Sequence, residues 1–104
     1  MQGLQNIKVS ELAKLKVDHP DLMILDVRTP KEIAGGKIDE KAIEIDFKAD
    51  SFEKKINDLN RDKTYLVYCK SGGRSSKTAN MMIMAGFKNV YNLEGGYSEW
   101  SSKN

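Results

Sequence analysis

One short stretch constrains the fold of this chain more than any other, because a strand pattern and a helix pattern meet there at the only cysteine. Residues 64–68 (TYLVY) form a β-branched and aromatic run that is typical of a buried strand. Residues 75–85 are rich in Ala and Met, contain neither Gly nor Pro, and are followed by Gly86, a common residue at a helix end. The stretch therefore predicts a strand, a tight loop and a helix in succession.

The loop between these two elements predicts a reactive cysteine. A loop that winds around a helix start points several main-chain N–H groups inward and adds the positive end of the helix dipole. Gly72 and Gly73 can adopt the backbone angles that bring such groups into a ring. At the base of this ring, Cys69 would be held as a thiolate by the N–H groups and by nearby Lys70 and Arg74. We therefore expect Cys69 to be the catalytic nucleophile.

The same loop would bind the anionic end of a substrate or the outer sulfur of a persulfide. Arg74 is the cation expected to contribute most, because a guanidinium can grip an oxyanion with two donors at once. The predicted substrate-binding residues are those that follow the cysteine: Lys70, Ser71, Gly72, Gly73, Arg74 and Ser75. Two plainer interpretations stand beside this one: Cys69 as a small apolar residue that ends a strand, and the cations as solvated surface charges.

Three segments of the chain resemble the signatures of one protein family. The first is residues 25–28 (LDVR) with Glu32 and residues 36–38 (GKI), the second is the loop that starts at Cys69, and the third is residues 90–100 (VYNLEGGYSEW). In this order they are similar to the single-domain rhodaneses, a family of sulfurtransferases. The family usually has a histidine and then Pro-Gly-Ala where residues 36–42 read GKIDEKA, so the resemblance does not fix the shape of that turn.

The resemblance implies an α/β, three-layer fold in which a mostly parallel sheet of about five strands has helices on both faces, formed by residues 1–104 as a single domain. It implies a thiosulfate sulfurtransferase that moves sulfane sulfur from a donor such as thiosulfate to cyanide or a cellular thiol through a Cys69 persulfide. Asp26 and Arg28 are expected to support the active loop by bracing it against neighbouring strands. No metal or organic cofactor is expected. The expected partners are the small-molecule donor, the thiol acceptor and, in one version, a sulfur-relay protein.

The length of the loop separates sulfur transfer from two related activities. Sulfurtransferases of this superfamily resemble one another in having four residues between the cysteine and the position of Arg74, and here these are Lys70, Ser71, Gly72 and Gly73. The related phosphatases and arsenate reductases have five, which gives a wider ring. The count favours sulfur, with those enzymes as the weaker alternative. A further alternative is a persulfide carrier that serves a specific partner protein.

Alternating patterns predict the rest of the fold. Strands are expected at residues 7–9, 22–27, 42–45, 64–68 and 90–93, and helices from Ser10, from Thr29, at residues 51–59 and 75–85, and after residues 95–96. Ser10 and Thr29 are the expected N-caps of their helices, and Glu32 is placed to reach back to Thr29. Strands that alternate with helices favour a parallel sheet between two helix layers, in which ligands bind beyond the carboxyl ends of the strands. Cys69 lies at one of those ends.

Composition limits the classes of function. The 104 residues fit one domain, a single cysteine excludes an internal disulfide, and a single histidine, His19, cannot build a metal site. A net charge of +2, with lysines scattered among acids, argues against a nucleic acid partner. No apolar run reaches the roughly 18 residues that span a bilayer, and the first residues do not resemble a signal peptide. We therefore expect no membrane partner and a cytoplasmic location, or a periplasmic one if an export signal has been trimmed.

Overall fold

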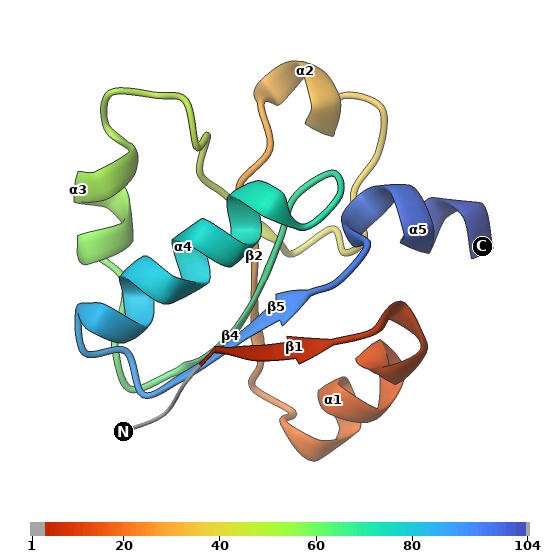
Figure 1. Cartoon of the computed structure of the whole chain (residues 1–104), viewed down its shortest axis with the longest axis horizontal. Coiled ribbons are helices and arrows are strands. Elements are labelled where there is room, and N and C mark those ends of the chain that lie inside the picture. Colours follow the sequence, from red (N-terminus) through yellow and green to blue (C-terminus); the bar gives the residue numbers. More distant parts are fainter. Residues whose placement is uncertain (1–3, 104) are drawn as a thin grey trace.

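The computed structural model describes residues 4–103 and arranges them around one parallel sheet (Figure 1). The five strands lie in the order β1-β5-β4-β2-β3, and every neighbouring pair is parallel. The strands are β1 (Gln5–Ile7), β2 (Met23–Asp26), β3 (Ile43–Glu44), β4 (Thr64–Tyr68) and β5 (Asn89–Leu93). The helices are α1 (Leu12–Asp18), α2 (Pro30–Ile33), α3 (Phe52–Asn57), α4 (Gly73–Met84) and α5 (Gly96–Lys103), and a 3-10 turn, η1 (Val9–Glu11), precedes α1. The predicted α/β class and five-stranded parallel sheet are confirmed.

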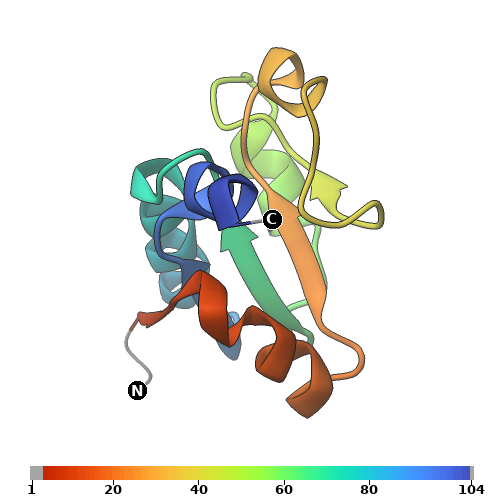
Figure 2. The same cartoon turned by 90° about the vertical axis from the view of Figure 1, so that its right-hand side faces the viewer.

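The side chains of the central strand β4 show how both faces of the sheet are buried. Tyr65 and Val67 belong to the core cluster that α3 and α4 close, whereas Leu66 and Tyr68 belong to a second cluster closed by α1, against which α5 packs. Figure 2 shows α1 and α5 in front of the sheet and α3 and α4 behind it. A strand that is apolar on both faces is typical of a parallel sheet with two helix layers. The predicted three-layer arrangement is therefore confirmed, and β4 gives firm support to the loop that follows it.

The structure confirms one predicted helix cap and corrects another. The Thr29 hydroxyl accepts the N–H of Glu32, and the Glu32 carboxylate accepts the N–H of Thr29, so the two residues form the predicted capping box of α2. Ser10 was expected to cap the first helix, but it lies inside η1. The N-cap there is Lys8, whose N–H donates to the Glu11 carboxylate at 2.9 Å. The Ser10 prediction is wrong because the chain already turns into η1 at Val9, so Ser10 lies within a helical turn, and the residue that precedes α1 is Glu11.

Strand and helix bounds differ modestly from the predictions. The strand expected at residues 7–9 is found at Gln5–Ile7 because the chain enters η1 at residue 9. The strand expected at residues 42–45 is only Ile43–Glu44, which pairs with the last two residues of β2. The longest helix, α4, has 12 residues, and within the described part of the chain no helix is long and apolar enough to cross a membrane.

The carboxyl ends of β2, β4 and β5 meet at one edge of the sheet. The N–H of Val27, just beyond β2, donates to the carbonyl of Tyr68 at the end of β4 at 3.1 Å. Helices α2, α4 and α5 follow these three strands and begin at the same edge (Figure 1). The predicted site residues therefore come together there, as ligand sites of parallel sheets do.

Candidate active site

The sulfur of Cys69 lies where donor groups of the following loop converge. It accepts hydrogen bonds from the Gly72 N–H at 3.1 Å, the Ser75 N–H at 3.4 Å and the Ser75 hydroxyl at 3.4 Å. Cys69 is 1% exposed and belongs to the core cluster under α3 and α4, yet its sulfur contacts the loop. These contacts are those of an anion cradle, and a merely apolar role for the cysteine does not account for them. We call the sulfur with its Gly72 and Ser75 donors the sulfur cradle.

The two loop glycines have different tasks. Gly72 has φ 108°, a left-handed conformation that side chains disfavour, and it turns the chain so that its N–H faces the sulfur. Gly73 was expected to shape the ring in the same way. It is instead the first residue of α4, and its φ is not positive. A side chain added at Gly73 would meet nothing within 4 Å. The helix therefore starts earlier than residue 75, where it was expected, because the turn is complete at Gly72.

Helix α5 holds the loop from the other side. The N–H groups of Tyr97 and Ser98 donate to the carbonyls of Cys69 and Lys70, each at 2.9 Å. This approach requires a glycine at the start of α5: a Cβ built on Gly96 would lie 2.5 Å from the Cys69 carbonyl oxygen, and Gly96 has φ 55°. The sequence predicts a turn at this glycine but gives no sign that the turn fastens the loop. A glycine at position 96 thus allows the start of α5 to approach the carbonyls of the active loop.

The cradle sets the ionisation of the cysteine. Burial acts to raise the pKa of the Cys69 thiol, because a buried anion loses hydration. The hydrogen bonds from the Ser75 hydroxyl and from the N–H groups of Ser75, Gly72 and Ser71 act in the opposite direction and outweigh burial. The pKa of Cys69 is therefore lowered from its ordinary value, as expected for a nucleophilic thiol.

Arg74 makes a contact that the sequence did not reveal. Its two terminal nitrogens donate to the two carboxylate oxygens of Glu32 at 2.8 and 2.9 Å, which is a bidentate ion pair between α4 and α2. The Arg74 hydrogen bond, with further hydrogen bonds from Thr29, lowers the pKa of Glu32 to about 2 despite partial burial. Glu32 is thus both a helix cap and the partner of the loop arginine. That Arg74 grips a substrate anion stays a prediction, and such an anion would have to compete with Glu32.

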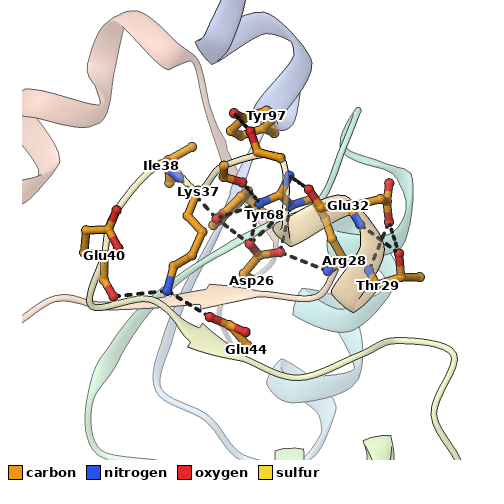
Figure 3. Close-up of polar contacts among 12 residues, drawn as sticks. Asp26, Arg28, Thr29, Glu32, Lys37, Ile38, Glu40, Glu44, Tyr68 and Tyr97 are labelled. Carbon is orange, nitrogen blue, oxygen red and sulfur yellow. Dashed lines mark hydrogen bonds and ion pairs between the residues drawn. The ribbon is translucent and has the colours of Figure 1, made fainter.

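Asp26 and Arg28 form the centre of a buried network, which we call the brace (Figure 3). Arg28 donates to both Asp26 carboxylate oxygens, through Nε at 3.0 Å and through Nη2 at 2.8 Å, and also to the Gly36 carbonyl at 2.6 Å. The Tyr68 hydroxyl donates to Asp26 at 2.5 Å and accepts the Ile38 N–H at 3.3 Å. The brace thereby ties the ends of β2 and β4 to the turn at residues 36–38.

The two charged residues of the brace are almost completely buried. Asp26 is fully buried and Arg28 is 2% exposed, and the guanidinium lies 4.3 Å from the centre of the Tyr97 ring of α5. Burial, together with the hydrogen bond to Asp26, raises the pKa of Tyr68 so that it keeps its proton. Asp26 and Arg28 thus contact Tyr68, the residue before Cys69, and that they brace the active loop stays a prediction. Tyr68, the last residue of the central strand, was not singled out from the sequence. Its hydroxyl contacts Asp26 and Ile38, which only the folded sheet brings close to it.

A cavity of about 330 Å³ opens beside the loop. The residues that line it are Arg28, Glu32, Lys70, Tyr97, Ser98 and Ser101. Lys70 is exposed there, as is Ser71 in the loop, so both predicted binding residues face solvent near the sulfur. A second cavity of about 420 Å³ lies toward the start of β2, beside His19, and none of the predicted site residues lines it. Within residues 4–103 no cluster of His, Cys, Asp and Glu could hold a metal ion.

Comparison with known proteins gives consistent matches over nearly the whole chain. A family model described as a rhodanese-like domain matches residues 8–103. The fold is similar to the crystal structure of a rhodanese-related protein from Thermoplasma volcanium, with a TM-score of 0.82 and 29% sequence identity; the match covers 96% of this chain and 93% of that one.

Two curated relatives differ in how much of their length this chain covers. A sulfurtransferase of Allochromatium vinosum is 29% identical over 98 residues, which cover 94% of this chain and 89% of the relative. A tRNA uridine(34) hydroxylase of Photorhabdus laumondii is 34% identical over 100 residues, which cover 90% of this chain but only 28% of the hydroxylase. The chain is thus similar to most of the first protein and to about a quarter of the second.

Proposed function

This chain belongs to the rhodanese-like domain family, and we propose that it is a sulfurtransferase that carries sulfane sulfur as a persulfide on Cys69. Sulfur transfer in general is the activity that the family and the Allochromatium relative support. The single observation behind the proposed mechanism is the sulfur cradle, in which the Gly72 N–H and both donors of Ser75 point at one sulfur atom. Donors fixed in this way stabilise a negative charge without having to reorganise during the reaction.

The loading step forms the persulfide. The Cys69 thiolate attacks the outer sulfur of a donor such as thiosulfate, a new S–S bond forms, and the S–S bond of the donor breaks. Sulfite leaves with the electron pair of that bond. Lys70, exposed beside the cavity, is the cation placed to meet the oxyanion end of the donor. The outer sulfur then carries the negative charge, and we expect main-chain N–H groups of the loop to stabilise it.

The unloading step returns the enzyme to its starting state. A thiophilic acceptor, cyanide in an assay or a thiol in a cell, attacks the outer sulfur, and Cys69 leaves as a thiolate. Because the cradle lowers the pKa of Cys69, it favours this leaving group as well as the attacking nucleophile of the first step. The chain's own residues supply every group in this scheme, and we propose no metal or organic cofactor.

The Arg74–Glu32 ion pair favours a second version of the same chemistry. With its guanidinium held by Glu32, Arg74 has less attraction for a small dianion than the sequence predicts. A persulfide delivered by another protein would not need that cation. In this version the domain is a sulfur carrier for a relay partner, and it would load slowly from thiosulfate but quickly from a protein persulfide.

Thiocyanate formation from thiosulfate and cyanide tests the proposal. We expect the Cys69→Ser variant to lose this activity entirely and Lys70→Ala to raise the thiosulfate KM, whereas Lys54→Ala, on the exposed side of α3, serves as a control with no effect. A serine variant with the wild-type rate would overturn the mechanism. Unchanged KM values in Lys70→Ala and Arg74→Ala would overturn the donor-binding roles, and a protein persulfide that loads far faster than thiosulfate would favour the carrier.

A further inference from the structure

A row of hydrogen-bonded side chains leads from the Cys69 sulfur to the edge of the sheet. The Ser75 hydroxyl lies 3.4 Å from the sulfur and 2.5 Å from Oδ1 of Asn92 in β5. Nδ2 of Asn92 in turn donates to Oδ1 of Asn6 in β1 at 2.9 Å, because the pairing register sets these two residues side by side. Ser75 and Asn92 are buried, whereas Asn6 is exposed. The reactive sulfur is thereby connected to solvent through side chains of three elements.

The Ser75 hydroxyl has more acceptors than it can serve. It has one proton, and three acceptors lie within reach: Asn92 Oδ1 at 2.5 Å, the Gly72 carbonyl at 3.2 Å and the Cys69 sulfur at 3.4 Å. While the sulfur is a neutral thiol, the Asn92 oxygen is the nearest acceptor and receives the proton. An anionic sulfur is a stronger acceptor, because charge-assisted hydrogen bonds are roughly twice as strong as neutral ones.

When the Ser75 hydroxyl donates to the sulfur and not to Asn92, the Asn92 amide needs a new hydrogen-bond arrangement. If the hydroxyl donates to the sulfur, its oxygen faces the Asn92 oxygen, and two lone pairs meet across 2.5 Å. The two ends of an amide have nearly the same shape, so a half turn of the Asn92 amide would present Nδ2 to Ser75 without repacking the core. Asn6 is exposed and can turn with it to donate to Asn92 Oδ1.

We propose that Asn92 is a positioning residue that acts on Cys69 through Ser75: it accepts the Ser75 proton while the sulfur is neutral and donates to the Ser75 oxygen while the sulfur is anionic. In the neutral state the sulfur has only its weak S–H donor to offer the Ser75 oxygen, whereas in the anionic state it receives a stronger, charge-assisted hydrogen bond from the Ser75 hydroxyl, and Asn92 supplies the donor that the Ser75 oxygen then needs. The same device would stabilise the outer charge of a persulfide through its inner sulfur. The proposal takes Cys69 as the reactive sulfur, as the proposed function does.

Charged groups near the loop also act on the sulfur and must stay constant in any test. Those that face the loop or belong to elements packed around it are Lys70 of the loop, Arg74 of α4 with its partner Glu32, Arg28 with its partner Asp26, and Glu99 of α5 with its partner Lys103. The hydrogen-bond partners of the Asn92 amide among residues 4–103 are Ser75 and Asn6, and none of these charged groups is one of them. Substitutions at Asn92 therefore change the row and leave these charges in place.

The pH profile of Cys69 alkylation by iodoacetamide measures the effect directly. Asn92→Ala removes the group that supports Ser75, so we expect the midpoint of the profile to rise and alkylation at pH 7 to slow by about three- to tenfold. Asn89→Ala, at the opposite end of β5, is the matched control and should leave the midpoint unchanged. A midpoint that stays the same or falls in Asn92→Ala overturns the proposal.

A double substitution separates action through Ser75 from a general loss of packing. In a Ser75→Ala background the hydroxyl is gone, so adding Asn92→Ala should shift the midpoint no further. An Asn92→Ala effect of undiminished size in that background would show that Asn92 does not act through Ser75, and would overturn the proposal.

Nuclear magnetic resonance of the wild-type protein provides a test that needs no substitution at Asn92. In ¹⁵N-labelled protein, the Nδ2–H signals of Asn92 should change with pH at the same midpoint as Cys69 alkylation, while those of Asn89 should not. Ser75→Ala should remove most of the Asn92 change although the sulfur still ionises. An Asn92 signal without an inflection, or one that persists in Ser75→Ala, overturns the proposal. No sulfur donor enters these measurements, so a failure of sulfur transfer would leave their outcome independent.

Discussion

The sulfur cradle and the brace lie side by side at one edge of the sheet, but they balance charge in opposite ways. In the brace, the guanidinium of Arg28 meets the carboxylate of Asp26, and both are buried, so the charges neutralise each other within the protein. In the cradle, main-chain and hydroxyl groups donate hydrogen bonds to the Cys69 sulfur, and no charged side chain takes part in these contacts. Paired side-chain charges therefore build the scaffold, whereas main-chain N–H groups that face the sulfur serve the chemistry.

The ion pair of Arg74 with Glu32 belongs with the brace in this comparison. Its position in the loop resembles that of a substrate-binding cation, yet its two donors already have a carboxylate partner. The pair fastens the start of α4 to α2 and so holds the cradle in shape. A cation in an active-site loop is thus not automatically a free charge.

Removing one partner of the brace should have the largest effect on stability. Arg28→Met keeps the length of the side chain but leaves the Asp26 carboxylate buried without its cation, so we expect a loss of about 3–5 kcal/mol in the free energy of unfolding. Urea denaturation measures it. Lys54→Met breaks the exposed pair with Asp58 and should change that free energy by less than about 0.5 kcal/mol. Equal losses in both variants would contradict the distinction between buried and exposed pairs.

The two glycines that flank the cradle should respond differently to a methyl group. Gly96→Ala places a Cβ against the Cys69 carbonyl at a positive φ, and we expect a loss of roughly 1–3 kcal/mol in the free energy of unfolding. Gly73→Ala meets no neighbour and improves helix propensity, so it should be neutral or stabilise by up to about 1 kcal/mol. Thermal and urea unfolding provide the values. A Gly96→Ala variant as stable as the wild type would mean that α5 does not hold the loop.

The Arg74–Glu32 pair should give a smaller, pH-dependent effect. Because the pKa of Glu32 falls from 4.5 to about 2 on folding, its stabilisation is complete above about pH 4.5 and is lost as the pH falls toward 2. Partial exposure limits this to about 1 kcal/mol. Comparison of wild type and Glu32→Gln by urea denaturation between pH 2.5 and pH 6 measures it, and the two curves should converge at low pH. A constant gap across this range would show that the carboxylate charge is not responsible.

Much of the scaffold could be predicted because its signals are local in sequence. The β-branched run at residues 64–68 is the observed strand β4, and the capping box of Thr29 and Glu32 forms as expected. The family, the parallel sheet and the position of Cys69 at a strand end follow from such local patterns. Gly72 was correctly expected to adopt an unusual backbone angle, since the tight turn allows few other residues.

What could not be predicted depends on residues brought together by the fold. Glu32 and Arg74 are 42 positions apart, and neither motif indicates that they meet. Asn92 and Asn6 are neighbours only because β1 pairs with β5, which places the first strand beside the last. Ser10 failed as a cap because the chain enters η1 at Val9, which places Ser10 inside a helical turn. In each case tertiary or competing local contacts decided between partners that the sequence leaves open.

Intact-mass spectrometry after incubation with thiosulfate and removal of excess donor shows whether Cys69 carries a persulfide. If the cradle keeps the Cys69 sulfur anionic and holds a second sulfur on it, the wild-type protein gains the mass of one sulfur atom, and a thiol or cyanide removes that mass. Cys69→Ser should gain nothing under the same conditions. A wild-type protein that stays unmodified with thiosulfate and with a persulfide donor, or a serine variant that gains the same mass, would contradict the account.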